Sequence, residues 1–223
     1  MLPEHVGDPR TSLGTLLLYA AVAGFLYVVF SFGTLVVGFV MPGDMVGEER
    51  RSGAIMMWAQ LPMPLTSFYL RRYLGVQAAN LVAQTLFALV AALAVPPGAR
   101  PLADLGVFLR SCAGGLLACA VTFAVTALGL HRAAFVALAY YLGSRLVGGI
   151  VGAMAADGGP FEWVATALSL LVFPVGPLRD LGAGVGTGNW DWEATGLILY
   201  HFAVWTGVAW AGLRRLERRP LAL

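Results

Sequence analysis

The side chains that could do chemistry are few, and most of them lie in one short polar segment of an apolar chain. That segment reads Gly47-Glu48-Glu49-Arg50-Arg51-Ser52-Gly53 and places two carboxylates beside two guanidinium groups. Adjacent carboxylates could act as general acid and base in hydrolysis. Elsewhere, Arg145 is the single charged residue within the long apolar stretch 134–156. A function has to be sought first at these two places.

Hydrolytic chemistry does not fit these residues. Intramembrane CAAX-type proteases carry Glu-Glu-x-x-x-Arg, but the position that would hold the Arg is Gly53. Rhomboid-like serine proteases need Gly-x-Ser-Gly and a His within hydrogen-bond reach, and Gly143-Ser144-Arg145 does not match. Three scattered His and two Cys residues make no metal set. Without any Lys, the chain has no phosphate-binding Gly-x-x-x-x-Gly-Lys-Ser/Thr loop. We expect no catalytic residue, metal or cofactor in this chain.

The composition indicates an integral membrane protein. Hydrophobic residues make up 59% of the 223 residues and charged residues 12%, and the mean hydropathy is +0.78. In soluble proteins about a quarter of the residues are charged. The net charge of +2 is too small and too scattered to indicate a nucleic-acid partner. We expect one all-α transmembrane domain over residues 1–223, with membrane lipids as its surroundings.

Five stretches are long and apolar enough to cross a bilayer, which takes about 20 residues as a helix. They are 13–41, 73–95, 106–130, 134–156 and 194–213. The segment 157–193 holds a further apolar stretch that Pro174 and Pro177 interrupt. We expect it to form a re-entrant or interfacial helical segment that packs on protein. The predicted fold is a polytopic helix bundle with five spans and this outer segment.

The arginines predict the orientation, because basic loops stay on the cytoplasmic side of the membrane. If 43–72 is cytoplasmic, nine arginines fall inside and three fall outside. The outer ones are Arg10, Arg100 and Arg179, and the inner ones are Arg50, Arg51, Arg71, Arg72, Arg132, Arg214, Arg215, Arg218 and Arg219. We therefore expect a multi-pass protein of the cell membrane with its N-terminus outside and its C-terminus in the cytoplasm.

The cytoplasmic loop is too organised to be a tether. Residues 48–61 are expected to form one short helix along the inner membrane face, because Glu48 and Glu49 suit a helix N-terminus and Pro62 and Pro64 follow its end. Its apolar side chains could sit among the headgroups or dock a soluble partner, a role for which Met is adaptable. They are Ile55, Met56, Trp58 and Leu61.

These residues carry a resemblance to a known family. The run Glu49-Arg50-Arg51-Ser52-Gly53-Ala54-Ile55, then Leu61-Pro62-Met63-Pro64 and Arg71-Arg72, resembles the first cytoplasmic loop of ABC-2 type transporter permeases. The turn at His131-Arg132, the broken outer segment and the basic tail also resemble that family's layout. Ala54 stands where Thr is usual. Family members usually have six spans and place this loop after the second. Here one span precedes it, so the family's first span has no counterpart. The alternatives are a natural short form, a start codon placed too late, and a missing helix supplied by another polypeptide.

The resemblance implies the permease subunit of an ATP-driven exporter, with transport outward. ATP and Mg would be bound by a separate ABC ATPase subunit, and two permease chains would work as a homodimer or heterodimer. The coupling residues would be Glu48, Glu49, Arg50, Arg51, Gly53, Ile55, Met56, Trp58, Leu61 and Pro62. The alternative is a non-transporting membrane scaffold or assembly subunit that docks a cytoplasmic partner through 43–64. A secondary carrier is disfavoured because no paired inverted halves are evident.

Arg145 is a second candidate site, because a charge near the middle of a span costs about 2.5–3.5 kcal/mol on insertion. With Tyr140 and Tyr141 it could line a pathway for an anionic or amphipathic substrate. Alternatively, it could pair inside the protein with a backbone carbonyl or with an acidic residue such as Asp157 or Glu162. Both interpretations are consistent with the residue pattern.

Two stripes of small residues predict close contacts between helices. One is Gly114, Ala118, Thr122 and Thr126, and the other is Ser144, Gly148 and Gly152. Cys112 and Cys119 lie seven residues apart in one apolar segment, too far apart on a helix to form a disulfide. We expect both stripes and both cysteines to serve internal packing, with a homodimer seam as the alternative for either stripe.

Overall fold

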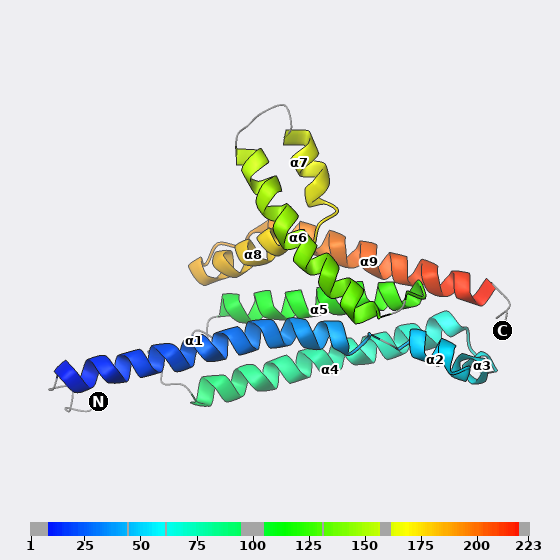
Figure 1. Cartoon of the computed structure of the whole chain (residues 1–223), viewed down its shortest axis with the longest axis horizontal. Coiled ribbons are helices and arrows are strands. Elements are labelled where there is room, and N and C mark those ends of the chain that lie inside the picture. Colours follow the sequence, from blue (N-terminus) through cyan, green and yellow to red (C-terminus); the bar gives the residue numbers. More distant parts are fainter. Residues whose placement is uncertain are drawn as a thin grey trace.

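The computed structural model describes residues 9–43, 45–60, 62–94, 105–130, 132–156 and 162–218. In this part of the chain all regular structure is helical, which confirms the predicted all-α class. The helices run in the order shown in Figure 1. They are α1 Pro9–Val40, α2 Gly47–Arg51, α3 Ala54–Ala59, α4 Leu65–Ala94, α5 Leu105–Ala127, α6 Ala133–Ala156, α7 Glu162–Ser169, α8 Val175–Thr187 and α9 Trp192–Arg218.

Four of the described helices are long and apolar enough to cross a membrane. The apolar stretches are Leu65–Val90 in α4, all of α5, Ala133–Ala153 in α6 and all of α9. The chain thus has the helices of a membrane protein. The first expected span, 13–41, falls in α1, whose side chains are described only in part, so a fifth crossing stays a prediction.

Helix α4 begins earlier than the expected span, at Leu65. Pro64 lacks a backbone N–H, but its carbonyl accepts the N–H of Phe68 at 3.1 Å and so starts the helix. The basic pair Arg71 and Arg72 therefore lies on α4 rather than in the preceding loop. The loop between the first two long helices is shorter than 43–72.

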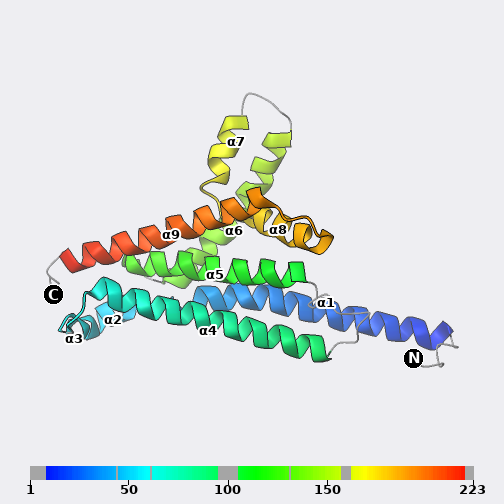
Figure 2. The same cartoon turned by 180° about the vertical axis from the view of Figure 1, so that it is seen from behind.

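Helix α5 lies at the centre of the molecule. It contacts α1 and α4 on one side and α8 and α9 on the other (Figures 1 and 2). In its most apolar stretch 67% of the residues are buried, against 22% in each of the other three apolar helices. Its small-residue stripe is buried throughout, which confirms that this stripe serves packing inside the chain. The stripe is Gly114, Ala118, Thr122 and Thr126.

Backbones approach closely around α5 because glycines stand at the crossing points. A Cβ added at Gly38 of α1 would clash with the carbonyl oxygen of Gly115. A Cβ added at Gly212 of α9 would lie 3.0 Å from the carbonyl of Ala127. Polar contacts add to this packing, since Gln77 of α4 donates to the carbonyl of Leu116 at 3.1 Å. Small residues and interhelical hydrogen bonds are the usual means of holding membrane helices together.

The turn after α5 depends on one glycine. Gly129 has φ 80°, a conformation that glycine adopts at little cost. Its N–H donates to the carbonyl of Thr126 at 3.0 Å, and the N–H of Leu130 donates to that of Val125 at 3.3 Å. This pair of bonds is the Schellman cap, which satisfies the last carbonyls of a helix. The chain then turns sharply into α6.

Helices α6 and α7 lie side by side and leave the layer of the other long helices at a steep angle (Figures 1 and 2). Ser144 of the second small-residue stripe is buried. A Cβ at Gly148 or Gly152, however, would meet nothing within 4 Å. The second stripe is therefore not packed along its length within the described chain, and the homodimer seam stays a prediction for it.

The outer segment forms two short helices, and the predicted break falls at Pro174; Pro177, expected to interrupt the segment as well, lies within the first turn of α8, where its missing N–H costs no helical hydrogen bond. α7 ends at Ser169, and Pro174 directly precedes α8. A second Schellman cap at Gly188 ends α8, and the Asp191 carboxylate then accepts the N–H of Ala194 at 2.9 Å to cap α9. The break in this segment is confirmed, and its re-entrant or interfacial placement stays a prediction.

We predict that Gly38→Val destabilises the protein, whereas Gly24→Val on the same helix does not. A side chain at Gly38 must displace the backbone of α5, while a Cβ at Gly24 meets nothing within 4 Å. Overpacking of this kind costs about 1–3 kcal/mol. The free energy of unfolding, measured in detergent micelles, should fall by that amount for Gly38→Val alone. Equal losses in both variants would contradict the close α1–α5 contact.

Candidate functional site

The polar segment between α1 and α4 forms two short helices, α2 and α3. We call residues 45–60 the connector. The expected single helix over 48–61 is wrong, because Gly53 adopts φ 75° and breaks the helix after Ser52. A left-handed residue cannot continue a right-handed helix. Leu61, expected to be part of this helix, lies outside the described residues.

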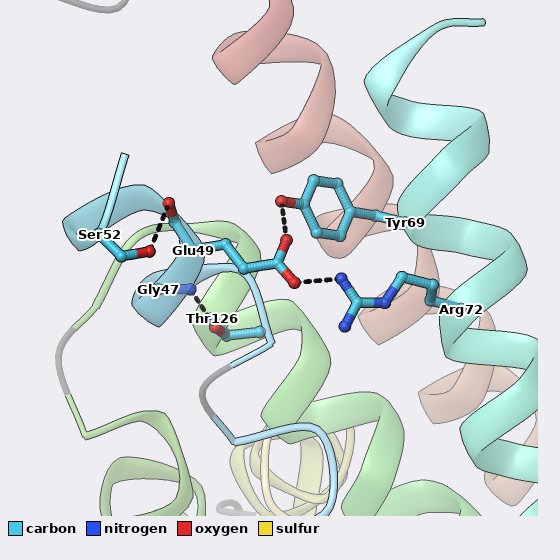
Figure 3. Close-up of polar contacts among 6 residues, drawn as sticks. All are labelled: Gly47, Glu49, Ser52, Tyr69, Arg72 and Thr126. Carbon is cyan, nitrogen blue, oxygen red and sulfur yellow. Dashed lines mark hydrogen bonds and ion pairs between the residues drawn. The ribbon is translucent and has the colours of Figure 1, made fainter. Parts of the chain in front are cut away.

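Glu49 ties the connector to α4. Figure 3 shows its carboxylate reaching from α2 to two residues of α4. The hydroxyl of Tyr69 donates to one carboxylate oxygen at 2.7 Å, and the guanidinium of Arg72 pairs with the other. The Arg72 guanidinium also lies over the rings of Phe68 and Tyr69, at 5.5 and 5.9 Å from their centroids. Because the Glu49 side chain is only 18% exposed, this pair is better shielded from water than an ordinary surface salt bridge.

Two further hydrogen bonds fix this end of the molecule, one between the connector and α5 and one between α4 and α9. The N–H of Gly47 donates to the hydroxyl of Thr126, near the end of α5, at 3.2 Å (Figure 3). The N–H of Thr66, at the start of α4, donates to the carboxylate of Glu217 on α9 at 2.5 Å. The ends of α4, α5 and α9 thus meet at the connector.

Apolar contacts hold the connector from the same side. Ile55 of α3 is 1% exposed. It belongs to a buried cluster with Tyr69 of α4, Phe123 of α5 and Leu213 of α9. Trp58 stacks on Phe68 of α4, with ring centroids 5.0 Å apart and an angle of 25° between the rings. These side chains bind α3 to the bundle rather than face a partner.

The opposite face of the connector is exposed. Met56 and Met57 are 42% and 61% exposed. Of the expected coupling residues, Glu49, Ile55 and Trp58 point into the bundle. The exposed ones are Glu48, Arg50, Arg51, Gly53, Met56 and Pro62.

Sequence reasoning missed part of this site. It did not single out Met57 on the exposed face or Tyr69 and Glu217 on the bound side, and it assigned Thr126 to a packing stripe without foreseeing its contact with the connector. The spacing of Tyr69 and Arg72 offered a signal, since residues three apart share a helix face. Thr126 and Glu217 carry no comparable local signal, because they come from distant parts of the chain.

Arg145 lines a cavity of about 350 Å³ between α5, α6 and α8. Tyr141 lines the same cavity, as do Arg110 of α5 and Arg179 of α8. Neither arginine was predicted for this site, although Arg110 is the single charge in the stretch 106–130. Asp157 and the side chain of Glu162, the alternative internal partners of Arg145, lie outside what the structure describes.

Tyr140 does not line this cavity. Its hydroxyl donates to the carbonyl of Leu171, in the link between α7 and α8, at 2.7 Å. Its ring packs against Trp205 of α9, with centroids 5.3 Å apart. Tyr140 therefore positions the outer segment against α9, and of the three residues expected on a pathway the structure brings together Arg145 and Tyr141.

No group of three or more His, Cys, Asp or Glu residues in the described ranges could hold a metal ion. Cys112 and Cys119 are both buried and free. Their expected role as small packing residues of α5 is confirmed.

We predict that Glu49→Ala loosens the connector, whereas Glu48→Ala leaves it in place. Hydrogen bonds to a charged group contribute about 1.5–3 kcal/mol. Glu49 makes two such contacts with α4, and the neighbouring Glu48 is exposed. Backbone amides of 47–60 should exchange with deuterium at least about tenfold faster in Glu49→Ala. Unchanged exchange in that variant would show that Glu49 does not hold the connector.

Comparison with known proteins finds no similar chain. No family model, curated protein or solved structure matches this sequence or fold. The resemblance to ABC-2 permeases therefore rests on the connector residues and the order of the expected spans. What the chain does has to be argued from its geometry.

Proposed function

We propose that this chain is the permease subunit of an ABC-2 type exporter, and that the connector is where a cytoplasmic ATPase subunit docks. One observation carries the proposal: the connector is bound on one face to three long helices and exposes two methionines on the other. A tether would have neither property. A docking element needs both, because its exposed face must bind the partner and its bound face must transmit the partner's movement to the long helices.

The contacts offer a path for that movement. A displacement of the connector would act on α4 through the contacts of Glu49. It would act on α5 through the hydrogen bond between Gly47 and Thr126. It would act on α9 through the buried cluster around Ile55. Closely packed helices shift between discrete arrangements rather than deform continuously. In the proposed mechanism, ATP binding closes the ATPase dimer, the connector follows, and two permease chains rearrange to open an outward route. The ATPase can bias this equilibrium only if it binds one arrangement more tightly.

The distribution of arginines supports a cytoplasmic connector. Three segments lie at one end of the molecule, away from the start of α1 (Figure 1). They are the connector, the turn between α5 and α6, and the end of α9. Arg50, Arg132 and Arg214 belong to these segments, and Arg71 lies in the first part of α4, which follows the connector. Basic residues favour the cytoplasmic side, so this end is the one that an ATPase could reach.

We predict that Met57→Glu disrupts the complex with the ATPase subunit, a Walker-type ATPase to be sought in the adjacent reading frame. Met57→Leu should preserve the complex. Burying a Met side chain contributes about 1.5–3 kcal/mol, so the affinity should fall about 10- to 100-fold for Met57→Glu. The measurement is co-purification of the two subunits, followed by titration in detergent. Because Met57 is exposed, neither variant should alter folding.

Three results would count against this function. They are the absence of an ATPase gene beside this one, failure of the two proteins to bind, and an affinity unaffected by Met57→Glu. A stable complex that hydrolyses ATP in liposomes without moving any substrate would favour the non-transporting scaffold instead.

A further inference from the structure

Three arginines from three helices meet at one cavity. Arg110 of α5, Arg145 of α6 and Arg179 of α8 line the same space of about 350 Å³. Among the residues that the structure describes, its lining includes no acidic side chain. Arg179 pairs with Asp180 through its Nε at 3.1 Å. An anion between these groups would offset their mutual repulsion, and guanidinium groups suit phosphate and carboxylate oxygens in particular.

A buried hydroxyl provides an independent observation. Ser111 lines the cavity and is 6% exposed. Its Oγ has no hydrogen-bond partner among the described residues. Serine inside a helix commonly donates to the carbonyl four residues earlier, and a buried polar group without a partner is destabilising. This hydroxyl is therefore a donor that an acceptor atom in the cavity could satisfy.

The remaining walls are apolar and well ordered by packing. Leu35, Phe173 and Leu178 line the cavity beside the arginines. The ring of Tyr141 meets that of Phe173 edge-on, with centroids 5.1 Å apart and an angle of 89°. A cationic wall next to an apolar wall suits a molecule with an anionic head and a hydrocarbon tail, not a small ion alone.

We propose that this cavity binds the phosphate headgroup of an anionic lipid. The phosphate would lie between Arg110, Arg145 and Arg179 and accept a hydrogen bond from Ser111, and its acyl chains would leave along the apolar wall into the bilayer. The volume is near the lower end of the range for small-molecule sites, about 300–1,000 Å³. It therefore suits a headgroup and not a whole lipid. This inference goes beyond the proposed export function, because binding requires no ATPase.

The test is a binding titration of the full chain in an uncharged maltoside detergent. The probes are phosphatidylglycerol and phosphatidylcholine carrying the same fluorophore on an acyl chain, and inorganic phosphate as a competitor. We expect saturable binding of phosphatidylglycerol at least about tenfold tighter than of phosphatidylcholine. Inorganic phosphate should displace the lipid only weakly, because it lacks the apolar part.

The variants distinguish lipid binding in this cavity from nonspecific attraction of the lipid to basic residues elsewhere on the protein. Arg145→Gln and Arg110→Gln should each weaken phosphatidylglycerol binding at least about tenfold. Arg145→Lys, which keeps the charge, should retain part of it. Arg71→Gln is the matched control, because Arg71 is exposed on α4 near the connector. Ser111→Ala should weaken binding several-fold without lowering the melting temperature of the lipid-free protein, since its hydroxyl has no partner to lose.

Equal binding of the two lipids, or equal losses in Arg71→Gln and Arg145→Gln, would overturn the proposal. Tight binding of inorganic phosphate alone would show an ion site and overturn the lipid assignment. A failure here leaves the export proposal intact, because that proposal is judged by the ATPase complex and Met57→Glu.

Discussion

The close packing of small residues along α5 is the constraint on which the rest of the structure depends. Membrane helices gain no hydrophobic energy by leaving lipid for one another, so they associate through contact area and hydrogen bonds. Gly115 lets α1 approach the backbone of α5, and Gly212 lets α9 approach it from the other side. A larger side chain at either crossing would move a whole helix. The two candidate sites would then lose their geometry, because both are built on α5.

Those sites lie toward opposite ends of α5. Thr126 holds the connector near one end, and Ser111 and Arg110 line the cavity near the other. Fifteen residues separate Ser111 from Thr126, a distance of about 22 Å along a helix. Both candidate sites therefore share α5, the most buried of the long apolar helices in the described chain.

The helices themselves were largely predictable, because each expected span is a long apolar run and Pro174 marks the break in the outer segment. The sequence-based predictions were wrong where a single residue, or a contact with a distant part of the chain, decides the local structure. Gly53 looks like an ordinary small residue in a helical pattern, yet its left-handed conformation divides the connector in two. The inward turn of Glu49 depends on Tyr69 and Arg72 of the next helix. Periodicity within one segment contains no information about such partners.

The sequence by itself determined that the chain is helical and suited to a membrane. It also pointed to the polar segment and to Arg145. Both follow from the sequence because hydropathy and isolated charges are properties of local sequence. Only the tertiary structure decided which face of the connector is bound and which is exposed. It alone placed Arg110, Ser111 and Arg179 beside Arg145. These residues come from three helices, and their proximity follows from how the helices cross α5, which depends on packing across the whole bundle.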